Sequence, residues 1–177
     1  MEIHILMAIQ ELHTPFLDFI FSHITALGNG GIFWILTGIF LFCLPKYRKQ
    51  GFLLLLSLLV CFLVGNVLLK NLIARDRPCW VYPEIELLIK VPKDYSFPSG
   101  HTMTGIAAAT AIWLTNKKWG IAAFILAGTI AFSRLYLFVH WPSDVLVAGI
   151  IGVLITLFVF GVSKHMQKGE EKLYENV

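Results

Sequence analysis

The sequence predicts an all-α membrane protein: a polytopic bundle of five to six transmembrane helices with an amphipathic N-terminal segment. Hydrophobic residues make up 57% of the 177 residues and charged residues only 14%, whereas a soluble domain carries about a quarter charged residues. The apolar residues also gather in long runs between short polar connections, as in helices that cross a bilayer. We expect a single domain over residues 1–177, in contact with the bilayer.

Five apolar segments are candidates for membrane spans. The first, residues 31–44, would be about 21 Å long at 1.5 Å per residue, so we expect it to take length from the residues before it. The other four segments are residues 51–69, 102–114, 120–138 and 145–162.

Residues 1–28 are apolar at helical spacing, but acidic residues interrupt the pattern and Thr14-Pro15 is expected to break the helix. A carboxylate at the bilayer centre costs about 3 kcal/mol. We therefore expect amphipathic helices that lie in the membrane interface, and a sixth, polar span is the alternative.

The positive charges predict the orientation in the membrane. They fall after the first span, between the third and fourth spans, and after the last span: Lys46, Arg48, Lys49, Lys117, Lys118, Lys164, Lys168 and Lys172. If the spans alternate, these three regions share one side, which the positive-inside rule makes cytoplasmic. The opposite ends of the spans then lie on the outer face of the cell (plasma or inner) membrane, where the acidic N-terminal segment also fits. The formal net charge of +3 is too small to suggest binding to nucleic acid, and we infer no obligate protein partner.

Three short blocks within residues 70–144 stand at the expected outer ends of apolar segments. They are Lys70 with Arg77-Pro78, then Pro98-Ser99-Gly100-His101, then Ser133-Arg134 with His140 and Asp144. Together they would place three cations, two histidines, a Ser-Gly turn and one carboxylate at one membrane level. Such a set can bind a phosphate group and break a P–O bond.

The cations Lys70, Arg77 and Arg134 are the candidate ligands of the phosphate oxygens, because Arg offers a planar fork and Lys a point charge. Lys70 and Arg134 lie at or inside the ends of spans, where a charge is costly unless it faces a polar site. The alternatives are that Lys70 snorkels to the headgroups and that Arg77 is an ordinary loop cation.

The second block would open a helix. Ser99 can cap it, Gly100 lets the backbone approach an oxyanion, and the free N–H groups at a helix N-terminus form an anion site. His101 in the first turn could serve as general acid. The alternative is an ordinary capped helix start.

His140 stands four residues before Asp144, so the carboxylate could reach one imidazole nitrogen and leave the other free to attack phosphorus. The alternative is an interfacial histidine beside a capping aspartate. The remaining histidines lack ligand spacing, so we expect no metal site and no cofactor. Of the three cysteines, Cys43 and Cys61 lie in apolar runs, Cys79 is a candidate for exposure in a loop, and none has an obvious disulfide partner.

The three blocks resemble the three-part signature of the type-2 phosphatidic acid phosphatase superfamily, with every signature position filled between Lys70 and Asp144. The resemblance implies that His140 is the nucleophile, Asp144 its partner and His101 the acid for the leaving group. It also implies that Lys70, Arg77, Ser99, Gly100 and Arg134 bind phosphate and that no metal ion is needed.

The resemblance further implies a lipid phosphate as substrate, with undecaprenyl pyrophosphate and phosphatidylglycerophosphate ahead of phosphatidate. A lipid-linked phosphotransferase and a lipid A 1-phosphatase are alternatives. The predicted spans disfavour a vanadium haloperoxidase. The complete histidine set disfavours a catalytically silent transporter or scaffold.

Overall fold

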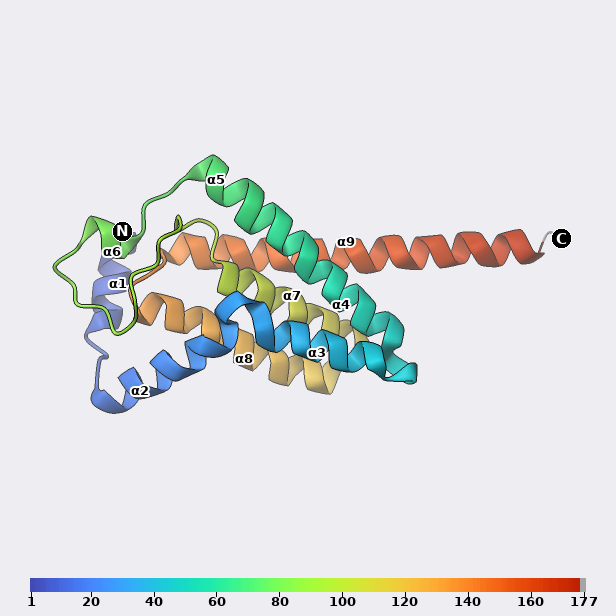
Figure 1. Ribbon diagram of the computed structural model, residues 1–177, viewed down its shortest axis with the longest axis horizontal. Coiled ribbons are helices and arrows are strands. Elements are labelled where there is room, and N and C mark those ends of the chain that lie inside the picture. The colour runs from blue at the N-terminus through green and yellow to red at the C-terminus, as the bar shows by residue number, and fades with distance from the viewer. Residues whose placement is uncertain (176–177) are drawn as a thin grey trace.

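Five helical segments run side by side along the long axis of the molecule (Figure 1). They are α3 (Ile32–Cys43), α4 (Arg48–Cys61) with its continuation through the π-helix η3 (Phe62–Leu69) into α5 (Lys70–Ile73), α7 (Gly100–Thr115), α8 (Lys117–Tyr136) and α9 (Pro142–Glu175). The computed structural model describes residues 1–175, with side chains through Met166, and this part of the chain is helical without strands. The predicted all-α bundle and its five apolar helices are confirmed.

Four stretches are long and apolar enough to cross a membrane, namely Pro15–Cys43, Pro45–Val81, Lys117–Tyr136 and Pro142–Met166. The fifth bundle helix, α7, has 16 residues and packs against α4, α8 and α9. Its alanines 107, 108, 109 and 111 are buried, and these small side chains let three helices approach it closely. Because α7 is enclosed by protein rather than by lipid, it forms the centre of the bundle.

The N-terminal residues form two helices, α1 (Glu2–Gln10) and α2 (Pro15–Ile24), and the expected break at Thr14-Pro15 is confirmed. Thr14 caps α2, since its hydroxyl accepts the N–H of Leu17 at 3.3 Å. α2 continues through the 3₁₀ segment η1 (Thr25–Gly31) into α3, and thereby adds the length that the first predicted span lacked. A kink separates η1 from α3, where Gly30 and Gly31 adopt left-handed φ angles of 59° and 68°.

α1 packs on the protein itself, which the interfacial interpretation did not include. Leu6 is fully buried in a cluster with Tyr136 and the connection 137–139 that leads to α9. Gln10 and His13 donate to the carbonyl oxygen of Tyr136 at 3.0 and 3.1 Å. The N-terminal helix therefore supports the end of α8 and the turn that follows it.

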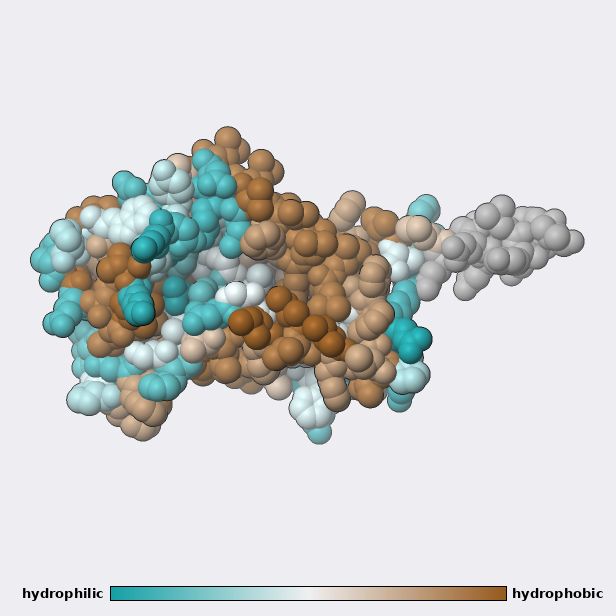
Figure 2. Space-filling view, in the orientation of Figure 1, coloured by the Kyte–Doolittle hydropathy of each residue, from teal (hydrophilic) through white to brown (hydrophobic). Residues whose placement is uncertain are grey.

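On the face shown in Figure 2, an apolar belt covers the middle of the molecule, and more polar surfaces lie on either side of it. One end carries the N-terminal helices, the short helix α6 (Pro78–Val81) and the long loop 82–99. The opposite end holds the 3₁₀ turn η2 (Pro45–Tyr47) and the α7–α8 turn, and residues from three segments, Lys49, Leu114 and Lys164, line one small cavity there. The three basic regions thus share one end, as expected, while the side chains of Lys168 and Lys172 lie outside the described part.

Cys79 is 7% exposed and packs in the same cluster as Leu6, so the expectation that it is accessible is wrong. Pro78 starts α6 directly after Arg77 and turns Cys79 inward. Cys61 is buried, and Cys43 is exposed at the end of α3.

Candidate active site

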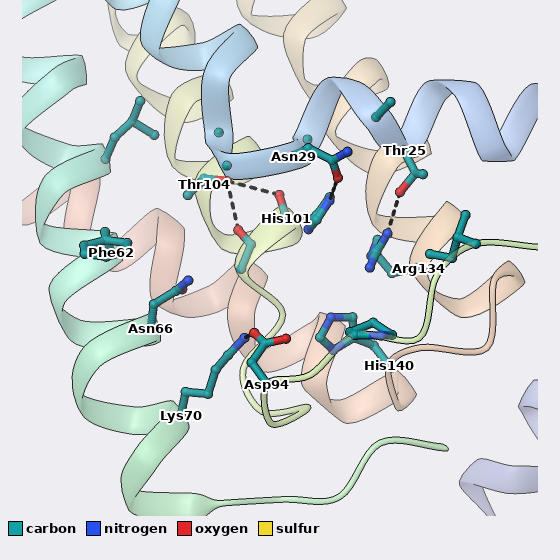
Figure 3. Close-up of a pocket in the computed structure, with 18 of the residues that line it drawn as sticks. Thr25, Asn29, Phe62, Asn66, Lys70, Asp94, His101, Thr104, Arg134 and His140 are labelled. Carbon is teal, nitrogen blue, oxygen red and sulfur yellow. Dashed lines mark hydrogen bonds and ion pairs between the residues drawn. The ribbon is translucent and has the colours of Figure 1, made fainter. Parts of the chain in front are cut away.

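The fold brings residues of the three sequence blocks together around one cavity (Figure 3). Lys70 begins α5, Arg77 precedes α6, and Arg134 lies in the last turn of α8, each with at most 6% of its surface exposed. His101 lies in the first turn of α7, and His140 lies in the connection between α8 and α9. One cavity touches all five of these side chains and Gly100.

Two of the three cations share the carboxylate of Asp94, which comes from the loop 82–99. Lys70 Nζ pairs with Asp94 Oδ2, and Arg77 Nη2 donates to Asp94 Oδ1 at 2.9 Å. Burial opposes ionisation of Asp94, but the hydrogen bond and charge of Lys70 and the charge of Arg77 outweigh it and lower the Asp94 pKa to about 2. An anion therefore already lies on these two cations.

Arg134 keeps part of its hydrogen-bonding capacity free. Its Nη1 donates to Thr25 Oγ1 at 2.7 Å, whereas its Nε is buried without a partner among the described residues. A buried unpaired donor costs about 1–3 kcal/mol. Arg134 thus lines the cavity and carries one buried donor without a partner among the described residues.

The start of α7 has the predicted cap. Ser99 Oγ accepts the Thr102 hydroxyl at 3.0 Å and its backbone N–H at 3.5 Å. Ser99 is fully buried behind the cavity, so its hydroxyl organises the helix start while Gly100 faces the cavity. Gly100 thus brings the backbone of this helix N-terminus, where N–H groups favour anions, to the cavity, while Ser99 is not among the lining residues.

His101 contacts a residue that the sequence did not point to. Its Nε2 donates to Asn29 Oδ1 at 3.0 Å (Figure 3), so the kink between η1 and α3 holds the imidazole. Gly28 is required beside it, because a Cβ there would lie 2.5 Å from Cδ2 of His101.

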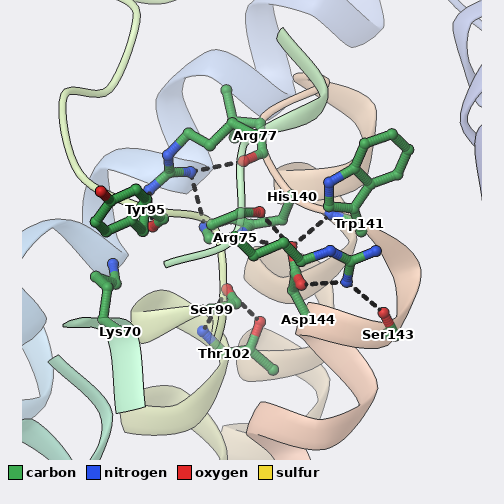
Figure 4. Close-up of polar contacts among 12 residues, drawn as sticks. Lys70, Arg75, Arg77, Tyr95, Ser99, Thr102, His140, Trp141, Ser143 and Asp144 are labelled. Atoms are coloured by element: carbon green, nitrogen blue, oxygen red, sulfur yellow. Dashed lines mark hydrogen bonds and ion pairs between the residues drawn. The ribbon is translucent and has the colours of Figure 1, made fainter. Parts of the chain in front are cut away.

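His140 lies between a cation and a carboxylate (Figure 4). Arg77 Nη1 donates to its Nε2 at 3.2 Å, which requires a lone pair on Nε2 and places the proton of the neutral ring on Nδ1. Nδ1 lies 3.6 Å from Asp144 Oδ2, within ion-pair range but longer than a hydrogen bond. Burial lowers the His140 pKa to about 3 despite the opposing effect of Asp144, so the ring is the free base that a nucleophile must be.

Asp144 is fully buried and has partners that sequence reasoning missed. Oδ1 accepts Arg75 Nη1 at 2.7 Å, while Oδ2 accepts the hydroxyl of Ser96 and the N–H of Trp141, the latter at 2.8 Å. Arg75 is a second arginine within the first block and was the one available signal. No sequence pattern pointed to Asp94, Ser96, Asn29 or Thr25, because only the folded loops bring these residues to the site.

The cavity has an apolar extension as well as an ionic end. Its volume is about 840 Å³, and it continues from the cations along α3, α4 and η3. The apolar side chains on this part are Ile35, Leu55, Leu58, Leu59 and Phe62. A phosphate at the ionic end and a hydrocarbon chain along the helices could occupy it together.

One end of this membrane helix bundle holds cations, imidazoles and a carboxylate, and an apolar cavity joins them. This arrangement defines a membrane protein suited to phosphoryl transfer on lipids. The family profile of the PAP2 superfamily matches residues 50–167. The chain therefore belongs to the PAP2 superfamily, as its sequence blocks suggested, and it is a multi-pass membrane protein with the fold of the membrane phosphatases in that family.

Three known proteins illustrate the similarity. An undecaprenyl-diphosphatase of Sulfolobus acidocaldarius is 35% identical over 124 residues, which is 70% of this chain and 60% of that relative's length. The crystal structure of Aquifex aeolicus LpxE is 28% identical, covers 90% of this chain and 94% of its own, and superposes with a TM-score of 0.79. The transmembrane PAP2-type phosphatidylglycerolphosphate phosphatase of Bacillus subtilis is also 28% identical, with 92% and 84% coverage and a TM-score of 0.74.

Proposed function

We propose that this protein hydrolyses a phosphomonoester or diphosphate of a membrane lipid through a phosphohistidine at His140. The observation that carries the proposal is the single cavity in which Lys70, Arg77, Arg134 and both histidines meet an apolar wall. The ionic end suits the phosphate and the apolar wall suits the lipid chain, so one substrate molecule would satisfy both.

In the first step, His140 Nε2 attacks phosphorus and the P–O bond to the lipid breaks. The departing oxygen takes the bond's electron pair and receives a proton from His101, which would be protonated in the complex because the bound phosphate offsets the charge of the neighbouring cations. Lys70, Arg77, Arg134 and the backbone at Gly100 neutralise the oxygens of the transferring group. Asp144 faces Nδ1–H of the ring, which becomes positively charged as the N–P bond forms.

In the second step, a water molecule attacks phosphorus and the N–P bond breaks. His101, now neutral, removes a proton from this water. Phosphate leaves and His140 returns to the free base. Because side chains supply the positive charge in both steps, the reaction as derived requires no metal ion.

Undecaprenyl diphosphate is the first substrate to test. The Sulfolobus acidocaldarius relative is named for undecaprenyl diphosphate, while the two structural relatives are LpxE and a phosphatidylglycerolphosphate phosphatase. The signature residues contact only the phosphate in this mechanism, so selectivity would come from the loop 82–99 and the apolar wall. Phosphatidylglycerophosphate, phosphatidate and lipid A phosphate are the competing substrates.

The experiment is phosphate release by the purified protein in detergent, from a panel of these four lipids, with and without EDTA. We expect release from at least one lipid at an unchanged rate in EDTA. Orthovanadate should inhibit, because its trigonal-bipyramidal adduct with His140 would resemble the transition state. Strict dependence on Mg²⁺ would contradict the mechanism, and release from none of the lipids would contradict the function.

A further inference from the structure

Arg75 lies between two carboxylates from distant parts of the chain. Its Nη1 donates to Asp144 Oδ1 and to Ser143 Oγ, both at 2.7 Å (Figure 4), and its Nη2 pairs with Glu2 Oε2 at 2.5 Å. The guanidinium also lies 5.2 Å from the ring centroid of Trp141, within cation–π range. One side chain thus joins α1 to the turn that carries His140 and to the start of α9.

Glu2 binds that same helix start directly. Its Oε1 accepts the backbone N–H of Ser143 at 2.9 Å, one of the free N–H groups in the first turn of α9. A carboxylate is favoured at this end of a helix by the helix dipole. Burial raises the Glu2 pKa, but the hydrogen bonds from Ser143 and the hydrogen bond and charge of Arg75 outweigh this and lower it overall, so Glu2 is ionised.

This arrangement restricts the rotation of the Asp144 carboxylate. Oδ1 is bound by Arg75, while Oδ2 is bound by Ser96 and Trp141 and faces His140 Nδ1 at 3.6 Å. Asp144 is 0% exposed, so water cannot replace a lost partner without a rearrangement. Without Arg75, a turn of the carboxylate about its Cβ–Cγ bond would move Oδ2 away from the imidazole.

The turn that presents His140 also depends on α1. Phe138 has a φ of 57°, a left-handed conformation that is strained for a bulky residue. Phe138 is fully buried in the cluster that contains Leu6 of α1. The N-terminal helix therefore holds both the turn before His140 and, through Glu2, the helix start after it.

We infer that Glu2 and Arg75 are a positioning pair that aligns Asp144 behind the nucleophile, so that α1 is part of the support of the active site. The inference rests on the proposed phosphohistidine mechanism. Neither residue exchanges a proton or touches the substrate; Arg75 fixes Asp144 where the ring develops positive charge, and Glu2 fixes Arg75.

The test compares Arg75→Ala and Glu2→Gln with the wild type in steady-state hydrolysis. Loss of the outer partner that orients a metal ligand typically costs about 10–100-fold. Arg75 orients Asp144 in a similar way, so we expect kcat to fall by about that factor while KM stays within about twofold. Low millimolar methylguanidinium should restore part of the kcat of Arg75→Ala, because the side chain it replaces is 30% exposed. Arg48→Ala and Glu11→Gln remove the same groups at exposed positions and should behave as wild type.

A second measurement needs no lipid. Diethyl pyrocarbonate modification of His140, followed by mass spectrometry, should be slower in Arg75→Ala while modification of His101 is unchanged. The inference would be overturned if both variants kept wild-type kcat and wild-type His140 reactivity. It would also be overturned if kcat fell and methylguanidinium did not restore it. Either outcome would leave the proposed function standing. A wild-type protein inactive on every lipid would instead overturn the proposed function, and slower modification of His140 alone would still support the positioning role.

Discussion

At the scale of single residues, the site combines groups that would repel each other without their partners. Lys70 and Arg77 are buried side by side and share Asp94, while Arg77 also donates to the carbonyl oxygen of Val139 at 2.6 Å and to His140 Nε2. Phosphate carries the charge and the several oxygens needed to take over the contacts that Asp94 now makes. In the proposed mechanism, substrate binding would therefore exchange one anion for another.

Replacement of His140 by alanine should abolish turnover, with a loss of at least about 10³-fold, because the covalent intermediate of the proposed mechanism forms on this imidazole. Phosphate release from the preferred lipid measures the loss. Quenching of the wild type with ³²P-labelled lipid in alkaline detergent should trap a base-stable, acid-labile phosphoprotein that is absent in the variant. Near-normal turnover in His140→Ala would assign the nucleophile elsewhere.

Asp94→Asn should lower KM several-fold and leave kcat nearly unchanged, because it removes the charge that competes with the substrate. The sign of the pH dependence follows from a pKa lowered to about 2. Asp94 stays ionised above its unfolded value near 4 and loses its charge only as pH falls toward 2, so the KM ratio of variant to wild type should be constant from about pH 5 to 8. Initial rates over that range provide the measurement, and a higher KM in the variant would show that Asp94 assists binding.

At the scale of helices and loops, the hydrophobic periodicity and composition of the sequence predicted the helices better than they predicted the contacts between them. The apolar runs marked all five bundle helices, and the spacing of His140 and Asp144 placed Asp144 at the start of α9 with His140 just before it. The partners of Asp144 were beyond prediction because Arg75 lies 69 residues away in sequence and Ser96 lies 48 away. The packing of α1 was missed for the same reason, since Glu2 reaches Ser143 across 141 residues.

The close contact of α7 with α9 gives a prediction at this scale. A Cβ on Gly152 would lie 2.6 Å from the carbonyl oxygen of Met103, and a backbone atom cannot rotate away. Gly152→Ala should therefore lower the free energy of unfolding by about 1–3 kcal/mol. It should also lower kcat, because α7 carries His101 and α9 carries Asp144.

Gly161→Ala is the matched control on the same helix. Nothing lies within 4 Å of a Cβ at Gly161, so this change should be neutral or slightly stabilising. Thermal unfolding of the two variants in detergent, followed by circular dichroism, makes the comparison. Equal shifts would mean that helix propensity, and not the contact with α7, determines the effect.

At the scale of the whole molecule, the exposed basic residues and the candidate active site lie at opposite ends. The exposed cations Lys46, Arg48, Lys49, Lys117 and Lys118 lie at one end, and the cavity with its ionic cluster lies toward the other. The apolar belt between them fits a bilayer in only two orientations (Figure 2). The positive-inside rule predicts the orientation in which the site opens to the outer face.

Cysteine accessibility in intact cells tests this orientation. Because native Cys79 is buried, the probes are Glu84→Cys in the loop at the site end and Lys117→Cys at the basic end, both at exposed positions. Each is made in a background in which Cys43, Cys61 and Cys79 are replaced. A membrane-impermeant maleimide should label Glu84→Cys in intact cells and Lys117→Cys only after the membrane is opened. The reverse pattern would place the site on the cytoplasmic face, where it could not act on a lipid carrier in the outer leaflet.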